Sequence, residues 1–131
     1  MSVSGAESKQ LVGRYLQALS GQAKPAEVVE RFVSDPALVE HIRLVEEGFP
    51  FYEVIAEELI AERDLVAVRA TFHGVHDGPF AGIEPTGKAV TSGFMIIYRV
   101  EGDRIAQHWL QFDVPGLIAQ LTAPAAMPAS V

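Results

Sequence analysis

The stretch AVTSGFMIIYRVEGDRIAQHWLQFD, residues 89–113, carries the clearest structural signal in the chain. Two runs rich in β-branched and aromatic residues, Ala89 to Val100 and Arg104 to Asp113, flank the short polar segment Glu101-Gly102-Asp103. Such a pattern is typical of two antiparallel strands that are joined by a hairpin turn. We therefore expect these residues to form part of an antiparallel sheet.

The residues before this hairpin predict two more strands. The run from Leu65 to His73 alternates, which places four apolar side chains on one face, namely Val66, Val68, Ala70 and Phe72. The run from Tyr52 to Ile60 fits a helix or a strand, and we favour a strand because Glu62-Arg63-Asp64 then makes a turn to the next run. The segment from Gly74 to Gly87 is rich in Gly and Pro and is expected to be a long loop.

The first fifty residues have a helical period. Apolar residues recur at helical spacing from Leu11 to Leu19, and the pattern stops at Ser20-Gly21, where glycine can close a helix. A second, short helix is expected to begin at Pro25. Asp35-Pro36 predicts the start of a third helix, since a capping residue precedes a proline, and this helix should end near Gly48.

Helices followed by antiparallel strands predict an α+β domain with helices on one face of a curved sheet. A length of 131 residues fits one domain, and a 49% hydrophobic composition with a mean hydropathy of +0.20 supplies a sizeable core. We place this domain at residues 1–121 and expect the Ala- and Pro-rich residues 122–131 to form a disordered or loosely packed tail. A pocket between the two layers is where a small apolar ligand would bind.

The composition also argues against several classes of function. With 10 Lys and Arg against 17 Asp and Glu, the formal charge of −7 does not suit a nucleic-acid-binding surface. The lack of Cys excludes disulfides, thiolate metal sites and a cysteine nucleophile. No run approaches the ~18 apolar residues of a membrane span, and Met1 to Gly5 lack the features of a signal peptide. We therefore expect a cytoplasmic protein that binds neither nucleic acid nor a membrane.

The long loop resembles that of a known family. The segment ATFHGVHDGPFAGIEPTGK, residues 70–88, is similar to the G-x-H-x-G-x-F-x-G-I-x-P-T-G-K loop of SnoaL-like polyketide cyclases, also called predicted ester cyclases. Further family elements fall on IYRV at 97–100, GDRI at 102–105, His108-Trp109, Asp113 and Gln120-Leu121. The resemblance extends from about residue 11 to residue 121. It implies the cone-shaped α+β fold that ketosteroid isomerase, limonene epoxide hydrolase and scytalone dehydratase share.

The resemblance also implies an activity and its principal residue. In characterised cyclases of the family, an aspartate after the tryptophan serves as general acid and base, which places that role on Asp113. A carboxylate walled by apolar residues has a raised pKa, so it can accept and return a proton during an intramolecular aldol closure. Such chemistry requires no metal and no cofactor. The alternative is that Asp113 caps the turn that follows it by accepting backbone N–H bonds.

Several candidate residues depend on which face of the last strand points inward. If Trp109 faces the pocket, then Gln107, Gln111 and Asp113 share that face, and both glutamines can hydrogen-bond a substrate carbonyl. Alternatively, the glutamines are solvated side chains on an outward face. His108 has the opposite parity and would then point to the outer face or to a subunit contact.

Three other residues are candidates for the site. His73 can serve as a proton-transfer partner at the mouth of the cavity, although an exposed structural role fits equally well. Tyr15 can offer a hydroxyl to the cavity or belong to the core. Phe80 is expected to anchor the long loop as a lid and to contact the substrate. His73, His76 and Asp77 do not form a convincing set of metal ligands.

These observations lead us to expect a cofactor-independent enzyme that closes a ring in a small hydrophobic carbonyl compound. An isomerase, a dehydratase or an epoxide hydrolase on the same fold is an alternative, as is a non-catalytic dimer that binds a small molecule. Because members of the family commonly pair through the outer face of the sheet, the resemblance also implies a homodimer.

Overall fold

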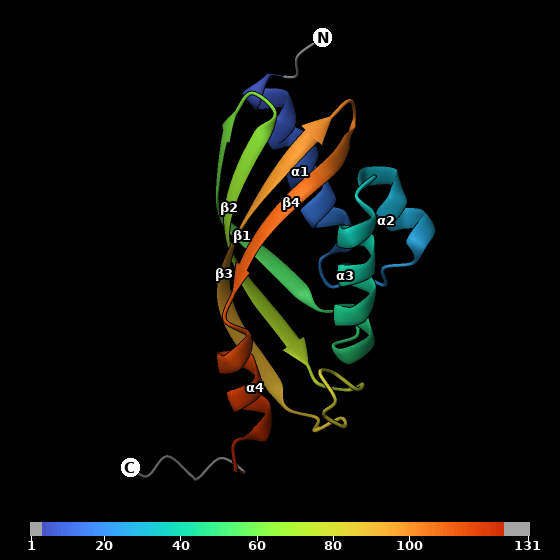
Figure 1. The fold of residues 1–131 in the computed structure, drawn as a ribbon, viewed down its shortest axis with the longest axis vertical. Helices are drawn as coiled ribbons and strands as arrows, with labels where there is room; N and C mark the ends of the chain where they lie inside the picture. The colour runs from blue at the N-terminus through green and yellow to red at the C-terminus, as the bar shows by residue number, and fades with distance from the viewer. Residues whose placement is uncertain (1–3, 125–131) are drawn as a thin grey trace.

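Three helices, four strands and a last helix follow one another along the chain (Figure 1). The structure is a computed structural model in which residues 4–124 are described. The elements are α1 (Gly5–Leu19), α2 (Ala26–Phe32), α3 (Pro36–Gly48), β1 (Glu53–Glu62), β2 (Leu65–Val75), β3 (Ala89–Glu101), β4 (Arg104–Phe112) and α4 (Val114–Thr122). The predicted order of helices and strands is confirmed, and so is the α+β class. Most of the predicted tail, residues 125–131, lies outside the described residues.

Local capping explains where the first and third helices begin. The Ser4 hydroxyl accepts a hydrogen bond from the Glu7 amide at 3.1 Å, which satisfies one of the free N–H groups at the start of α1. At the start of α3, Asp35 Oδ1 accepts from the Ala37 amide at 3.0 Å, and Pro36 occupies the first turn. Asp35 therefore holds a fixed position at the N-terminal end of α3.

The four strands form one antiparallel sheet in the order β1-β2-β3-β4, and α1, α2 and α3 lie on one side of it (Figure 1). The face toward the helices carries the buried side chains of β2 and β3, which are Val66, Val68, Ala70, Phe72, Val90, Ile96, Tyr98 and Val100. Six of them form one cluster with Leu11, Val12, Tyr15, Leu16 and Leu19 of α1, whereas Phe72 and Val90 belong to a second cluster with Phe49, Tyr52, Leu117 and Leu121. The inner face that the alternation predicted for β2 is therefore confirmed.

A β-bulge interrupts the last hairpin. Val100 pairs with Ile105, whereas the preceding residue, Arg99, pairs with Gln107, so Ala106 is an extra residue on β4. A bulge of this kind shifts the alternation of the strand by one residue. Ile105 before the bulge and His108 after it consequently face the same side of the sheet.

Helix α4 covers the edge of the sheet where β4 ends. It has nine residues, Val114–Thr122. The pairing of β3 with β4 starts at Phe94 of β3, so residues 89–93 of β3 have no partner on β4. There, Oε1 of Gln120 accepts from the Thr91 amide at 3.2 Å, and Nε2 of Gln120 donates to the Thr91 carbonyl at 3.0 Å. One side-chain amide thus occupies the place of a partner strand.

Candidate functional site

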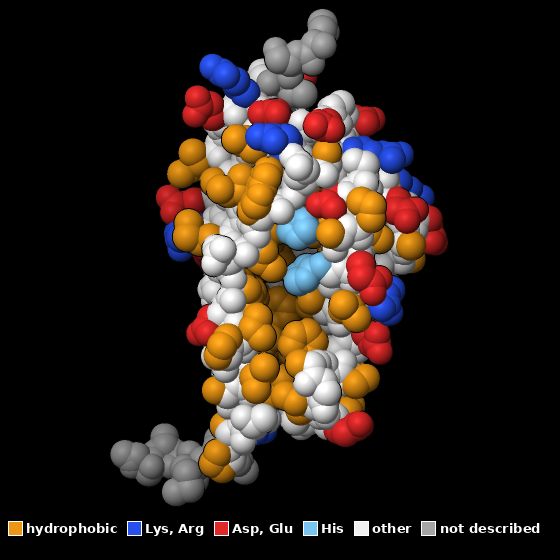
Figure 2. Space-filling view, viewed as in Figure 1, with side chains coloured by type: hydrophobic (Ala, Val, Ile, Leu, Met, Phe, Trp, Pro, Cys, Tyr) orange, Lys and Arg blue, Asp and Glu red, His pale blue; other side chains and the backbone are white. Residues whose placement is uncertain are grey.

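A cavity of about 120 Å³ lies between the sheet and the helices. Eight of the residues that line it are aromatic, namely Tyr15, Phe49, Tyr52, Phe72, Phe80, Phe94, Tyr98 and Phe112. Figure 2 shows an apolar hollow with histidine side chains at its edge. Its apolar wall makes this cavity a candidate site for a small hydrophobic ligand.

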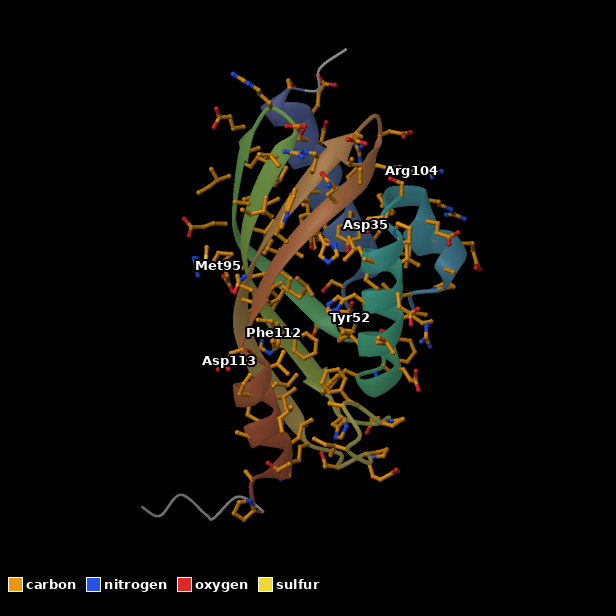
Figure 3. All side chains as sticks on the ribbon, viewed as in Figure 1. Asp35, Tyr52, Met95, Arg104, Phe112 and Asp113 are labelled. Atoms are coloured by element: carbon orange, nitrogen blue, oxygen red, sulfur yellow. The ribbon has the colours of Figure 1, made fainter. Side chains whose placement is uncertain are left out.

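The inner face of β4 is opposite to the one that the sequence analysis assumed. Leu110 and Phe112 line the cavity, and Trp109 lies on the outer face with 46% of its surface exposed. In Figure 3, Phe112 points toward the helices and Asp113 points away from them. The condition that Trp109 faces the pocket is not met, and the bulge at Ala106 is the reason that Trp109 and the buried Ile105 lie on opposite faces.

Four predicted site residues therefore lie outside the cavity. Asp113 is exposed and caps α4, since its side chain accepts a hydrogen bond from the Gly116 amide at 2.9 Å. Gln107 accepts a hydrogen bond from the Arg99 guanidinium at 2.9 Å, and the same guanidinium lies 5.5 Å from the centre of the Trp109 ring. Gln111 lies beside Asp113 in an outer groove. The role that the resemblance assigns to Asp113 stays a prediction, as do the ligand contacts expected of the other three side chains, but the structure does not bring these side chains to the cavity.

Of the other three predicted residues, two line the cavity and one lies on the outer face of the sheet. Tyr15 and Phe80 line the cavity, and Tyr15 also belongs to the buried core. His73 lies on the outer face, where its Nδ1 is 3.0 Å from the Thr91 hydroxyl oxygen. The structure therefore separates His73 from Tyr15 and Phe80.

Sequence reasoning missed a hydrogen-bonded pair that joins the first helices to the last strand. Nδ1 of His108 lies 2.8 Å from Oδ2 of Asp35, and the two side chains are only 16% and 13% exposed. Because a carboxylate can only accept, Nδ1 carries the hydrogen and Nε2 carries the lone pair of a neutral ring. His108 shares the inner face of β4 with Leu110 and Phe112. Asp35 was recognised only as a cap, and the two residues are 73 positions apart.

A second histidine completes this group. The His41 ring lines the cavity, and its centre lies 6.4 Å from the centre of the His108 ring. Burial lowers the pKa of His41, and the neighbouring His108 lowers it further. A neutral imidazole therefore lies in the wall beside the Asp35–His108 pair.

Phenol hydroxyls supply the other polar atoms of the cavity. Tyr15 and Tyr98 interact through their side chains, with ring centres 5.6 Å apart. Burial raises the pKa of Tyr15, Tyr52 and Tyr98 above the ordinary value for a phenol. All three hydroxyls therefore stay protonated at neutral pH and can donate hydrogen bonds.

Lys24 is a buried cation in the wall, and protein acceptors engage it. Its Nζ donates to the Gln22 carbonyl at 2.8 Å, to Glu46 Oε1 at 2.9 Å and to the Tyr52 carbonyl at 3.0 Å. It also lies 4.0 Å from the centre of the Tyr52 ring. Burial lowers the pKa of Lys24, and Glu46 opposes this effect. With three acceptors for its three hydrogens, the ammonium group has a structural role.

The long loop is fastened at both ends. Nδ1 of the buried His76 accepts from the Thr86 amide at 3.1 Å, and the Gly87 amide donates to the His76 carbonyl at 2.8 Å. The Gly78 amide donates to the Gly48 carbonyl at the end of α3 at 3.2 Å. These bonds hold Phe80 against the ring of Phe49, with ring centres 5.1 Å apart. The loop therefore forms a fixed part of the cavity wall.

Candidate metal-binding clusters and helices able to span a membrane are both absent from residues 4–124. No group of three or more His, Asp or Glu side chains in this range is arranged to hold a metal ion. None of the helices described here is both long and apolar enough to cross a membrane.

Comparison with known proteins identifies relatives of the chain. The family model described as SnoaL-like polyketide cyclase matches residues 15–121. No curated protein matches the chain.

Solved structures share the fold at low sequence identity. AclR from Streptomyces galilaeus is 22% identical, with a TM-score of 0.78 over 96% of this chain and 87% of AclR. TsrD from Streptomyces laurentii is 26% identical, with a TM-score of 0.75 over 93% of this chain and 99% of TsrD. A SnoaL-like polyketide cyclase from Agrobacterium tumefaciens strain C58 is 20% identical, with a TM-score of 0.70 over 87% and 97% of the two chains.

Proposed function

The chain belongs to the SnoaL-like polyketide cyclase family, and on that premise we propose that it is an enzyme that closes a ring in a hydrophobic carbonyl compound by acid–base chemistry. The observation that carries this proposal is the 2.8 Å hydrogen bond between Asp35 and His108, because the His108 ring lies 6.4 Å from that of His41 in the cavity wall. An oriented imidazole next to a dry binding site is suited to proton transfer at neutral pH. We assign the proton transfer to His108 and the orientation of its ring to Asp35.

The proposed reaction is an intramolecular aldol closure. Nε2 of His108 takes a proton from a carbon that lies between two carbonyl groups, which leaves an enolate. The enolate carbon attacks a ketone of the same molecule, so that one carbon–carbon bond forms and the ketone oxygen becomes an alkoxide. The alkoxide then takes the proton back from Nε2 of His108. No atom is gained or lost, and the imidazole returns to its neutral form.

Other groups in the wall support this assignment. The protonated hydroxyl of Tyr15, which accepts a hydrogen bond from Tyr98, can donate to an enolate oxygen, and such a donor stabilises negative charge most effectively where water is excluded. His41 stays neutral beside His108, so it adds no positive charge that would oppose protonation of that ring. Asp35 stabilises the imidazolium that forms after proton removal.

Deuterium exchange at an activated carbon tests the proposal. We expect the protein to accelerate exchange at C2 of 2-acetylcyclohexanone in D₂O, as followed by ¹H NMR. His108→Gln should reduce the catalysed rate at least about 100-fold, since general-base catalysis contributes factors of this size. His73→Gln, on the outer face, is the matched control and should keep the rate. An unchanged rate in His108→Gln would refute the role of His108, and a protein that binds the compound without exchange would be a binding module.

We also propose that the protein forms a homodimer through the outer face of the sheet. A row of paired residues crosses this face from Ile60 through Ala67 and Ile97 to Trp109. Ile60 is 68% exposed, Ile97 42% and Trp109 46%, so the row is an apolar strip that a second copy would cover. Sedimentation equilibrium at micromolar concentration should give twice the monomer mass, and Ile97→Glu should give the monomer mass. A monomer in both proteins would contradict the dimer.

A further inference from the structure

We propose that the substrate of this cavity is an uncharged carbonyl compound of single-ring size, and that compounds with three fused rings are excluded from it. This inference rests on the proposed function for the chemistry of the ligand. Its own evidence is the volume of the cavity and the rigidity and charge of the wall.

The volume admits one ring. The cavity measures about 120 Å³, whereas pockets for drug-sized ligands measure roughly 300–1,000 Å³. An apolar protein cavity of about 150 Å³ is known to accept benzene. A six-membered ring with short substituents therefore comes close to filling this cavity, and a second fused ring has to move the wall or protrude from the open side of the hollow.

Interlocked aromatic rings resist such a movement. Phe49 contacts Phe72 and Phe80 in edge-on arrangements, with ring centres 5.4 Å and 5.1 Å apart. Phe94 and Phe112 pack at 5.5 Å on the neighbouring strands. Close-packed rings in preferred geometries cannot be displaced without the loss of many contacts at once.

The loop that carries Phe80 is also held close to α3. A side chain at Gly48 would place its Cβ only 2.8 Å from the Cβ of Phe80, so the two segments touch at the limit that glycine allows. The Gly78 amide bond to the Gly48 carbonyl, at 3.2 Å, fixes this approach. The wall formed by Phe80 is therefore a boundary of the site.

The charge of the wall favours a neutral ligand. Among the described lining residues, Lys24 is the one lysine or arginine, and its three hydrogens are directed to Gln22, Glu46 and Tyr52. A ligand carboxylate would lose its hydration and gain no cation in exchange, which costs free energy. Phenol hydroxyls, by contrast, can donate to the oxygen of a neutral ketone or ester.

Two ligand series test size and charge separately. The size series is 2-acetylcyclohexanone, 2-acetyl-1-tetralone and a linear three-ring analogue, and the charge pair is methyl 4-acetylbenzoate and 4-acetylbenzoate. Binding is measured by methyl NMR titration, with Leu38 and Ile42 as cavity probes. We expect the one-ring compound to bind at least tenfold more tightly than the two-ring compound. The three-ring compound should not shift the signals of the cavity probes. The ester should bind at least tenfold more tightly than the acid.

A variant pair checks that the wall sets the limit. Leu110→Ala enlarges the cavity and should improve binding of 2-acetyl-1-tetralone about tenfold relative to 2-acetylcyclohexanone. Ile97→Ala, on the outer face of the neighbouring strand, is the matched control and should leave this ratio unchanged. If Leu110→Ala is too unstable to titrate, the ligand series on the unmodified protein still decides.

The possible failures can be told apart. Tighter binding of the three-ring compound at the cavity probes, equal binding of acid and ester, or no binding of any compound would overturn the inference. Size-selective binding without catalysed deuterium exchange would leave the inference standing and would refute the proposed function.

Discussion

Asp35 and His108, 73 residues apart in the chain, are joined by a hydrogen bond of 2.8 Å between Oδ2 and Nδ1. The other carboxylate oxygen, Oδ1, accepts from the Ala37 amide at 3.0 Å and caps α3. One carboxylate therefore anchors a helix and orients an imidazole. Because the helix fixes the carboxylate, the ring on β4 is held in one tautomer and one direction.

Asp35→Asn should disturb this double role. An amide has one acceptor oxygen, so it cannot serve both the Ala37 amide and the His108 ring. We expect the rate of catalysed deuterium exchange to fall at least about tenfold and the free energy of unfolding to fall by about 1 kcal/mol. Correlation of ring nitrogens with carbon-bound protons in ¹⁵N-labelled protein should show a changed tautomer at His108.

Asp113→Asn is the matched control for that experiment, because Asp113 is also the N-cap of a helix but contacts no histidine among its recorded partners. The variant should keep the rate and lose no more than about 1 kcal/mol of stability. A loss of turnover in Asp113→Asn with full turnover in Asp35→Asn would restore the catalytic role that the resemblance assigns to Asp113.

Acid should destabilise the fold through His41. Burial and the neighbouring His108 lower the pKa of His41, whereas an unfolded histidine titrates near its ordinary value of about 6.5. The unfolded chain therefore binds more protons below about pH 6.5, so this stability is fully present above that pH and decreases as the pH falls. Thermal unfolding between pH 7.5 and 5 should be less pH-dependent in His41→Gln than in the unmodified protein. His73→Gln should keep the original slope, and an equal slope in all three proteins would contradict the assignment.

Removal of the anion beside Lys24 should be costly. Glu46→Gln leaves a buried ammonium group without its carboxylate partner, and we expect the free energy of unfolding to fall by about 2 to 3 kcal/mol. The double variant Lys24→Met with Glu46→Gln should be more stable than Glu46→Gln alone, because the buried charge is then gone. Glu40→Gln breaks the exposed pair with Arg43 and should lower the stability much less in the same denaturant titrations, because solvent screens this pair. Equal losses of stability in Glu46→Gln and Glu40→Gln would show that burial does not make the Lys24–Glu46 pair more important for stability.

Two glycine substitutions should change the free energy of unfolding in opposite directions. A Cβ at Gly13 in α1 has no atom within 4 Å, so Gly13→Ala should stabilise the helix by about 0.5 to 1 kcal/mol. A Cβ at Gly78 would lie 1.9 Å from the carbonyl oxygen of Glu47, so Gly78→Ala should displace the loop from α3 and cost about 1 to 3 kcal/mol. Denaturant titration measures both effects, and a neutral Gly78→Ala would mean that the loop is not held where the structure places it.

The sequence predicted the elements of this fold because each one has a local signal. The strand alternation from Leu65 to His73, the turn at Glu101-Gly102-Asp103 and the cap at Asp35 all depend on neighbours within a few residues. The order of these elements then permits few architectures. The curved sheet and the pocket between the layers were expected from this order as well, and the family resemblance implied the same cone-shaped fold.

The site was harder to predict because two of its determinants are not local. The bulge at Ala106 depends on how β4 pairs with β3, and no residue type in Ile105-Ala106-Gln107 indicates a bulge. In a strand without the bulge, Trp109 and Asp113 would share the inner face with Ile105, and His108 would point outward. The bond between Asp35 and His108 needs that reversed face together with the placement of α3, so it could be seen only in the folded chain.

The contact between Gln120 and Thr91 has a consequence for solubility. Backbone groups at an open sheet edge can pair with a strand of another molecule and start aggregation. The Gln120 amide occupies both groups of Thr91 at the point where β4 leaves the sheet, so α4 shields the strand from such pairing. A single glutamine in a terminal helix is in this way a safeguard against fibre formation.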